Sequence, residues 1–193
     1  DHRDLHLSIR RQRQMCIRDR LQHYQHYLRA KCQVVSIGGT YVYPIFRVGY
    51  SSLMEDADMV FTDREIDNCP TITVLLRDPK ARFISGVNEY CRQNSKDLDQ
   101  IYKKIQLGKL VDRHFMPQYL WLLHLYKYHK GSVVLRPFSH IKEITQVHAN
   151  ANKSKRHIEP IDRFIKIDNF LLRHLNKKVL LRNIITRYKD VLS

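Results

Sequence analysis

A chain of 193 residues is long enough to form one domain with a buried core, and its formal net charge of +15 predicts an anionic substrate or partner. The four cysteines lack metal-ligand spacing and are too few for a disulfide framework, and no zinc-finger, helix-turn-helix or RNA-binding signature links the basic charge to nucleic acid. No stretch of this sequence approaches the ~18 apolar residues of a membrane-spanning helix, and none has the pattern of a signal peptide.

The first twenty residues differ in character from the rest of the chain. They are rich in arginine and glutamine without helical or strand periodicity, and residues 14–20 resemble a translated adapter sequence. We therefore expect residues 1–20 to be a non-native or disordered extension of a domain that covers residues 21–193. Removing their six arginines and three aspartates lowers the formal charge from +15 to +12, so the chain stays basic.

A strand is predicted over Tyr41–Phe46, where β-branched and aromatic residues span a strand's length. The loop that follows consists of Arg47, Val48, Gly49, Tyr50, Ser51 and Ser52. Its glycine permits a tight turn and a close approach of a ligand, and either serine can N-cap a following helix, whose free N–H groups would face the turn. With an arginine and two hydroxyls, the loop is a candidate phosphate or sulfate site, although it also fits an ordinary strand-turn-helix corner. It lacks the Gly-x4-Gly-Lys-Ser/Thr pattern of a Walker A loop.

A second strand-to-helix junction follows about thirty residues later. A buried strand is predicted over Thr71–Leu76, with Asp78 as the N-cap of a helix and Pro79 at its first position, where the missing N–H costs nothing. The apolar stripe of that helix consists of Phe83, Ile84, Val87, Tyr90 and Cys91.

The two junctions are expected to belong to one βαβ unit over residues 41–76 with a right-handed crossover. Arg47 and Arg77 each follow one of its strands. Because ligands bind beyond the carboxyl ends of the strands in such sheets, the sequence predicts that both arginines lie at one site.

The remaining elements are read from periodicity and turn residues. Strands are expected at 33–37, 59–62 and 132–135; helices at 21–30, 97–107, 117–129, 138–147 and 181–192; and loops at 63–70 and 149–158. Glu55 to Asp58 fit a first helical turn after the serines, Ser139 fits a cap for the helix at 138–147, and Lys155 and Arg156 make the loop at 149–158 basic.

Several of these stretches resemble the sulfotransferases, nearest the Golgi-type carbohydrate branch. Arg-Asp-Pro followed by Arg-Phe-x-Ser, at residues 77–85, resembles their 3′-phosphate-binding segment, and residues 47–52 resemble their 5′-phosphosulfate loop, usually Pro-Lys-x-Gly-x-Ser/Thr-Ser. Residues 112–118, Asp-Arg-His-Phe-Met-Pro-Gln, are similar to the Asp-x-His-Trp-x-Pro-Gln stretch of carbohydrate sulfotransferases. Residues 187–190 are similar to the Tyr-x-x-Asp with which many members finish, so the resemblance covers roughly residues 40–190 in the family's order.

The resemblance implies an α/β fold, namely a P-loop-like three-layer sandwich in which helices flank a short central parallel sheet. It implies an enzyme that moves a sulfuryl group from 3′-phosphoadenosine 5′-phosphosulfate (PAPS) to a hydroxyl, on a carbohydrate or another acceptor, without a metal. Arg77 and Ser85 would hold the 3′-phosphate, and the loop 47–52 would hold the 5′-phosphosulfate, with Arg47 at the leaving group. His114 is the candidate general base, because an imidazole can accept a proton at neutral pH.

Several readings stay open at this point. The alternative for His114 is a histidine that only packs at a helix entry, and Asp112 either orients it or binds the acceptor. Arg47 stands where lysine is usual and Tyr50 where a small residue is usual, which is consistent with an altered rate, an unusual acceptor or a decayed enzyme. Tyr50 would either crowd the sulfate or stack on the adenine.

Two other functions are alternatives. A P-loop-like kinase would need a carboxylate for Mg²⁺ near the loop, for which Asp56 and Asp58 are the candidates. A non-catalytic basic glycan- or nucleotide-binding domain would bind in a salt-dependent way without needing Arg77. The compartment would be the cytoplasm of a microbe or the Golgi lumen of a eukaryote, in which case a membrane anchor lies outside this sequence.

Overall fold

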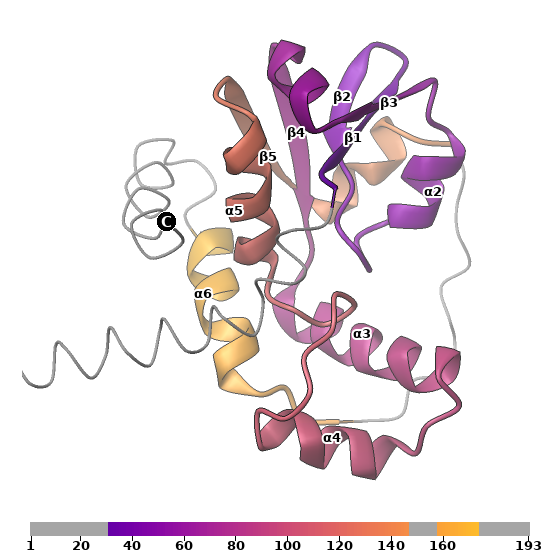
Figure 1. Cartoon of the computed structure of the whole chain (residues 1–193), viewed down its shortest axis with the longest axis vertical. Coiled ribbons are helices and arrows are strands. Elements are labelled where there is room, and N and C mark those ends of the chain that lie inside the picture. The colour runs from indigo at the N-terminus through magenta and orange to yellow at the C-terminus, as the bar shows by residue number, and fades with distance from the viewer. Residues whose placement is uncertain (1–30, 147–157, 174–193) are drawn as a thin grey trace, which may run out of the picture.

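A computed structural model of the chain describes residues 31–146 and 158–173 (Figure 1). The predictions for residues 1–30, for the basic loop around Lys155 and Arg156, and for the helix at 181–192 lie outside the described residues.

Five strands form one open sheet in the order β3-β1-β2-β4-β5. Their bounds are β1 Gln33–Ile37, β2 Thr40–Tyr43, β3 Met59–Thr62, β4 Thr71–Leu76 and β5 Ser132–Pro137. The neighbours β2, β4 and β5 are parallel, whereas β1 runs antiparallel to both β2 and β3. The expectation of a parallel sheet is therefore correct for three adjacent strands and wrong for the sheet as a whole. The tight turn at Gly38–Gly39 forms a hairpin, and a hairpin can join only antiparallel strands.

Helices cover both faces of this sheet. Their bounds are α2 Tyr50–Glu55, α3 Pro79–Gln93, α4 Leu98–Gln106, α5 Gln118–Tyr128 and α6 Asp162–Arg173, with 3-10 turns η1 Asp63–Asn68 and η2 Phe138–Glu143. Neighbouring strand residues point to opposite faces, so Val34 joins the main core while Val35 packs in a smaller cluster with Leu53 of α2. Figure 1 shows α5 on one side of the sheet and α2 on the other. The chain is thus an α/β protein with a mixed sheet between helical layers.

Most predicted elements of the central region are confirmed. Strands β1, β3 and β4 have the expected bounds, and α4 and α5 lie within theirs. Helix α3 begins at Pro79, and the Asp78 carboxylate accepts a hydrogen bond of 2.7 Å from the Ala81 N–H, as an N-cap should. None of the helices in the described ranges is long and apolar enough to cross a membrane.

Several expectations about individual elements are wrong. Strand β2 ends at Tyr43 rather than Phe46, because Pro44 has no N–H to donate to a ladder. Helix α2 begins at Tyr50 with Gly49 as its N-cap, so neither serine caps it, and Glu55 closes the helix instead of opening one. The segment expected to be a Ser139-capped helix is a 3-10 turn that ends at Glu143, and the loop expected at 63–70 contains η1.

Helix α6 was not predicted at all. It packs against α3 and α5, and Phe164 and Ile165 bury their side chains in the main core. This helix brings a buried carboxylate, Asp168, to the region described next.

Candidate anion-binding site

Three parallel strands end at one edge of the sheet, and the segments after them form the site. Tyr43 of β2 pairs with Val74 of β4, and Leu76 of β4 pairs with Pro137 of β5. This register places the Arg47 loop, Arg77 and η2 at the same edge, since each follows the carboxyl end of its strand. The prediction that Arg47 and Arg77 share one location is confirmed.

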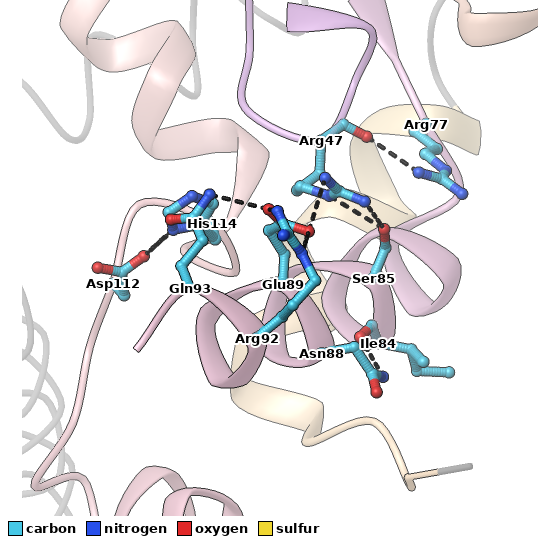
Figure 2. Close-up of polar contacts among 10 residues, drawn as sticks. All are labelled: Arg47, Arg77, Ile84, Ser85, Asn88, Glu89, Arg92, Gln93, Asp112 and His114. Carbon is cyan, nitrogen blue, oxygen red and sulfur yellow. Dashed lines mark hydrogen bonds and ion pairs between the residues drawn. The ribbon is translucent and has the colours of Figure 1, made fainter. Parts of the chain in front are cut away.

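Arg47 contacts both Arg77 and the helix α3 directly (Figure 2). Arg47 donates from Nε and Nη2 to Ser85 Oγ, at 3.1 and 2.8 Å, and Arg77 Nη1 donates to the Arg47 carbonyl oxygen at 3.0 Å. Arg47 has a φ of 65°, in the left-handed region that residues other than glycine seldom adopt. Such strain persists where the surroundings over-determine the conformation, and it is common at functional sites.

Helix α3 presents a polar face toward this edge. Arg82, Ser85, Gly86 and Glu89 are all buried and recur at helical spacing on one side of α3. The sequence prediction used only Ser85 of these four. The signal that could have found the others is the combination of three polar residues and a glycine at i, i+3, i+4 and i+7.

Arg82 joins the loop to the segment that carries His114. Its guanidinium is fully buried and donates from Nε to the Phe46 carbonyl at 3.1 Å and from Nη1 to the Met116 carbonyl at 2.6 Å. Its Nη2 has no hydrogen-bond partner among the residues that the structure describes. Burial lowers the pKa of Arg82 to about 10. This buried arginine therefore has one donor available for a further acceptor, and the Asp168 carboxylate partly balances its charge.

The closeness of two arginines favours an anion at this site. Burial is the larger cause that lowers the pKa of Arg77, and the nearby Arg47 guanidinium lowers it further. The exposed Asp78 carboxylate acts in the opposite direction, and Glu89 and Asp168 are buried carboxylates of the same region. An oxyanion bound between Arg47 and Arg77 would relieve their mutual repulsion.

Asp168 and Gln118 fix the position of Arg77. The Asp168 carboxylate accepts from the backbone N–H groups of Gln118 and Tyr119, at 2.6 and 2.9 Å, and so caps the start of α5. The Gln118 side chain in turn pairs with the Arg77 backbone, accepting from its N–H and donating to its carbonyl, both at 2.9 Å. Burial raises the pKa of Asp168 to about 6.

His114 lies beside the loop in contact with Asp112. Its Nδ1 is 2.5 Å from the Asp112 Oδ1, and its ring meets the edge of Phe46 at a centroid distance of 5.3 Å. The backbone of His114 approaches α3 so closely that a Cβ at Gly86 would lie 2.1 Å from the His114 carbonyl oxygen. The imidazole is therefore both packed and held by a carboxylate, and a proton shared between Nδ1 and Asp112 leaves Nε2 as the acceptor nitrogen.

The other predicted loop residues have different surroundings. Val48 and Ser52 are buried, and Ser51 is exposed. Tyr50 stacks on Phe46 at a centroid distance of 4.3 Å. Gly49 has a φ of 73°, and a Cβ there would lie 2.1 Å from Ile141 Cδ1. The space over Gly49 is thus filled by η2, so the expected close approach of a ligand to this glycine is not open in this conformation.

Phe46 is the centre of an aromatic cluster that the sequence prediction missed. It stacks on Trp121 at 5.5 Å as well as on Tyr50, and the exposed Arg113 guanidinium lies 4.5 Å from its ring centroid. An aromatic face with a cation over it stiffens the turn that carries Arg47.

The carboxylates proposed for a kinase-type metal site have other partners. Asp56 accepts from the Thr145 hydroxyl and from the Gln146 N–H, and Asp58 accepts from the Gly38 N–H at 2.7 Å. In residues 31–146 and 158–173, no group of three histidine, cysteine, aspartate or glutamate side chains is arranged to hold a metal ion.

Comparison of the chain with family models, with curated proteins and with solved structures finds no match. What the site can do is therefore inferred from its own chemistry. Two adjacent guanidinium groups and a hydroxyl are suited to bind the oxygens of a phosphate or sulfate, because the planar fork of arginine matches two oxygens of one anion.

Proposed function

We propose that this chain is a sulfotransferase, which moves a sulfuryl group from PAPS to a hydroxyl of a carbohydrate or another acceptor. The observation that carries the proposal is the contact between Arg47, Ser85 and Arg77, which come from two segments that resemble the two nucleotide-binding segments of sulfotransferases. His114 lies next to this contact, on the segment that resembles a third family motif. The basic net charge suits a polyanionic nucleotide, and it would suit an anionic glycan.

The fit of PAPS to these residues differs between its two ends. Arg77 and Ser85 suit the 3′-phosphate, because both lie at the edge where Arg47 and Arg77 disfavour each other's positive charge. The 5′-phosphosulfate fits Arg47, whose side chain is 26 % exposed, better than it fits Gly49, which η2 covers. In the proposed complex Arg47 exchanges its Ser85 contact for the ligand, since both groups would face the same nucleotide.

Each residue then has a definite task. Bound PAPS supplies the activated sulfuryl group, whose bond to the bridging phosphate oxygen breaks as a new S–O bond forms to the acceptor hydroxyl. Arg47 neutralises the charge that develops on the bridging oxygen. His114 Nε2 takes the proton of the acceptor hydroxyl, while Asp112 holds Nδ1 and stabilises the resulting imidazolium. The products are a sulfate ester and adenosine 3′,5′-bisphosphate.

The finer fold description belongs to the same proposal. Helices on both faces of an open sheet are compatible with a three-layer sandwich. A loop and α2 follow β2, and after β3 and η1 the chain returns to β4, the parallel neighbour of β2, which is compatible with a P-loop-like arrangement. Helix α2 has only six residues, so Arg47, rather than a long helix dipole, would provide most of the positive charge at the 5′ end.

A thermal-shift experiment tests the proposal. Adenosine 3′,5′-bisphosphate should raise the melting temperature, while AMP and ATP at the same concentration should not, because only the first carries a 3′-phosphate for Arg77 and Ser85. Transfer of labelled sulfate from PAPS to a pool of glycans then separates an enzyme from a binding domain. Equal stabilisation by ATP and magnesium would favour a kinase, and no response to any nucleotide would refute the proposal.

A further inference from the structure

Glu89 is a buried carboxylate inside the arginine cluster. Its side chain is 6 % exposed, and its Oε2 lies 3.5 Å from Arg47 Nη1 (Figure 2). It stands one helical turn after Ser85, so Arg47 reaches both residues on the same face of α3. No part of the proposed reaction uses a carboxylate at this position.

A second arginine holds Glu89 from the solvent side. Arg92, which is 65 % exposed, donates from Nη2 to Oε1 at 2.5 Å and from Nε to Oε2 at 3.2 Å, and Gln93 donates to Oε1 at 2.8 Å. The hydrogen bond from Arg92 lowers the pKa of Glu89, which keeps the carboxylate charged at neutral pH. Glu89 is therefore an anion shared between one arginine of the site and one arginine at the surface.

We propose that Glu89 is an internal counter-anion, which occupies Arg47 until a ligand displaces it and thereby makes the site selective for ligands with two separate anionic groups. The inference rests on the proposed nucleotide-binding function for the identity of that ligand. It assigns a specificity-determining role to a residue outside the motifs that carry the family resemblance.

The hydrogen bonds of Arg47 show why displacement is needed. Its Nε and Nη2 both point to Ser85, and its Nη1 faces Glu89. An incoming anion must take over these donors. Glu89 does not become an unpaired buried charge when Arg47 leaves it, because Arg92 and Gln93 keep their hydrogen bonds to the carboxylate. The exchange is therefore energetically feasible at Arg47 and would be costly without Arg92.

Selectivity follows from the repulsion between Glu89 and the ligand. A single anionic group at Arg47 also meets the negative charge of Glu89, which cancels part of its attraction. A second anionic group at Arg77 meets less opposition, because the Arg77 side chain contacts the Arg47 carbonyl and the Phe138 ring, and the nearby carboxylate of Asp78 is exposed to solvent. Ligands with one anionic group should bind weakly, and a 3′,5′-bisphosphate should bind well.

Calorimetric titration of Glu89→Gln tests this inference with three probes: inorganic sulfate, AMP and adenosine 3′,5′-bisphosphate. The affinity for sulfate and AMP should rise about tenfold, and the ratio of bisphosphate to AMP affinity should fall, because the opposing charge is gone while the side chain keeps its shape. Glu159→Gln, the same substitution at an exposed position, is the matched control and should change no affinity. Unchanged or weaker sulfate binding by Glu89→Gln would overturn the inference.

A double-mutant cycle separates two effects of Arg92 on sulfate binding: its hydrogen bonds to Glu89 and the general attraction of its positive charge for an anion. Arg92→Ala should weaken sulfate binding in the wild-type chain, because Glu89 then loses its surface arginine and Arg47 becomes its main cationic partner, and should have little effect in the Glu89→Gln background. Equal losses in both backgrounds would contradict the role given to Glu89. If Glu89→Gln does not fold, Glu89→Asp, which withdraws the carboxylate from Arg47 but keeps its charge, should show a smaller rise in sulfate affinity, and no rise would overturn the inference.

The outcomes distinguish this inference from the proposed function. Bisphosphate binding that ignores Glu89 would leave the sulfotransferase proposal intact and refute the counter-anion. Sulfate binding that responds to Glu89, in a chain that does not bind the bisphosphate, would support the counter-anion and refute the sulfotransferase proposal.

Discussion

Arg47 combines an unusual backbone conformation with a central place in the hydrogen bonds of the site. Arg47→Ala should abolish sulfuryl transfer and should weaken the binding of PAPS more than that of adenosine 3′,5′-bisphosphate, because the side chain serves the sulfated end. Arg47→Lys should keep nucleotide binding and keep or raise the turnover, since a compact ammonium group suits a single bridging oxygen. Transfer assays and titrations of the two variants check this, and full activity of Arg47→Ala would contradict the assignment.

Arg82 should matter for stability as much as for function. Arg82→Met leaves the Phe46 and Met116 carbonyls without their donor, so the free energy of unfolding should fall by about 2–4 kcal/mol. Arg64→Met, at an exposed position of η1, should change it by less than about 0.5 kcal/mol. Urea unfolding of both variants measures the difference. Similar losses in unfolding free energy would show that the hydrogen bonds of the buried guanidinium do not stabilise the fold.

At the residue scale, the sequence predicted that Arg47 and Arg77 lie at one site, because each residue follows one of the two strands expected to form a βαβ unit. It did not predict that the Arg77 side chain donates to the Arg47 carbonyl. It did not predict Arg82 or Glu89, since charged residues on a helix are usually exposed and their burial depends on which elements cover that face. It placed Ser51 and Ser52 at a helix N-cap, but the left-handed turn at Gly49 starts the helix at Tyr50.

Helix α6 supplies a pH-dependent contact between elements. The folded protein raises the pKa of Asp168 from 3.8 to about 6, because burial disfavours the charged carboxylate. A raised pKa means that this group's contribution to stability is full below pH 3.8 and is lost as the pH rises through 6.

The test of this contact compares the wild type with Asp168→Asn. As the pH falls from 7 to 5, the unfolding free energy of the wild type should increase by about 1 kcal/mol relative to that of the variant. Chemical unfolding at several pH values measures the difference. A difference that does not change between pH 7 and 5 would show that the carboxylate is not desolvated in the folded state.

At the element scale, periodicity predicted the strands and the helices α3, α4 and α5, because each has a cap or a turn residue at its ends. It missed α6, although Phe164, Ile165 and Asp168 lie at helical spacing with a polar residue among apolar ones. It also extended β2 across Pro44, where the ladder must stop for lack of an N–H.

The whole molecule is an α/β protein, as predicted, but its sheet is mixed. The Gly38–Gly39 turn is a local signal for the antiparallel pair of β1 and β2, but no local feature pairs β1 with β3, because that pairing depends on contacts between distant residues. The parallel pairing of β2, β4 and β5 could be predicted from the sequence, and these three strands position Arg47 and Arg77.

The prediction at this scale concerns residues 1–20, whose sequence has no apolar periodicity. A chain that lacks them should have an unchanged melting temperature and an unchanged affinity for adenosine 3′,5′-bisphosphate, because no apolar stripe in them can pack on the core. Differential scanning calorimetry of the shortened chain checks this. A drop of several degrees would show that the segment belongs to the folded domain.

The most direct test of the central claim is the affinity of Arg77→Ala for two nucleotides that differ only in the 3′-phosphate. Loss of a charge-assisted, bidentate contact should weaken adenosine 3′,5′-bisphosphate about tenfold or more, while the affinity for AMP should change little. An equal loss for both nucleotides, or no loss for either, would contradict the assignment of Arg77 and Ser85 to a 3′-phosphate.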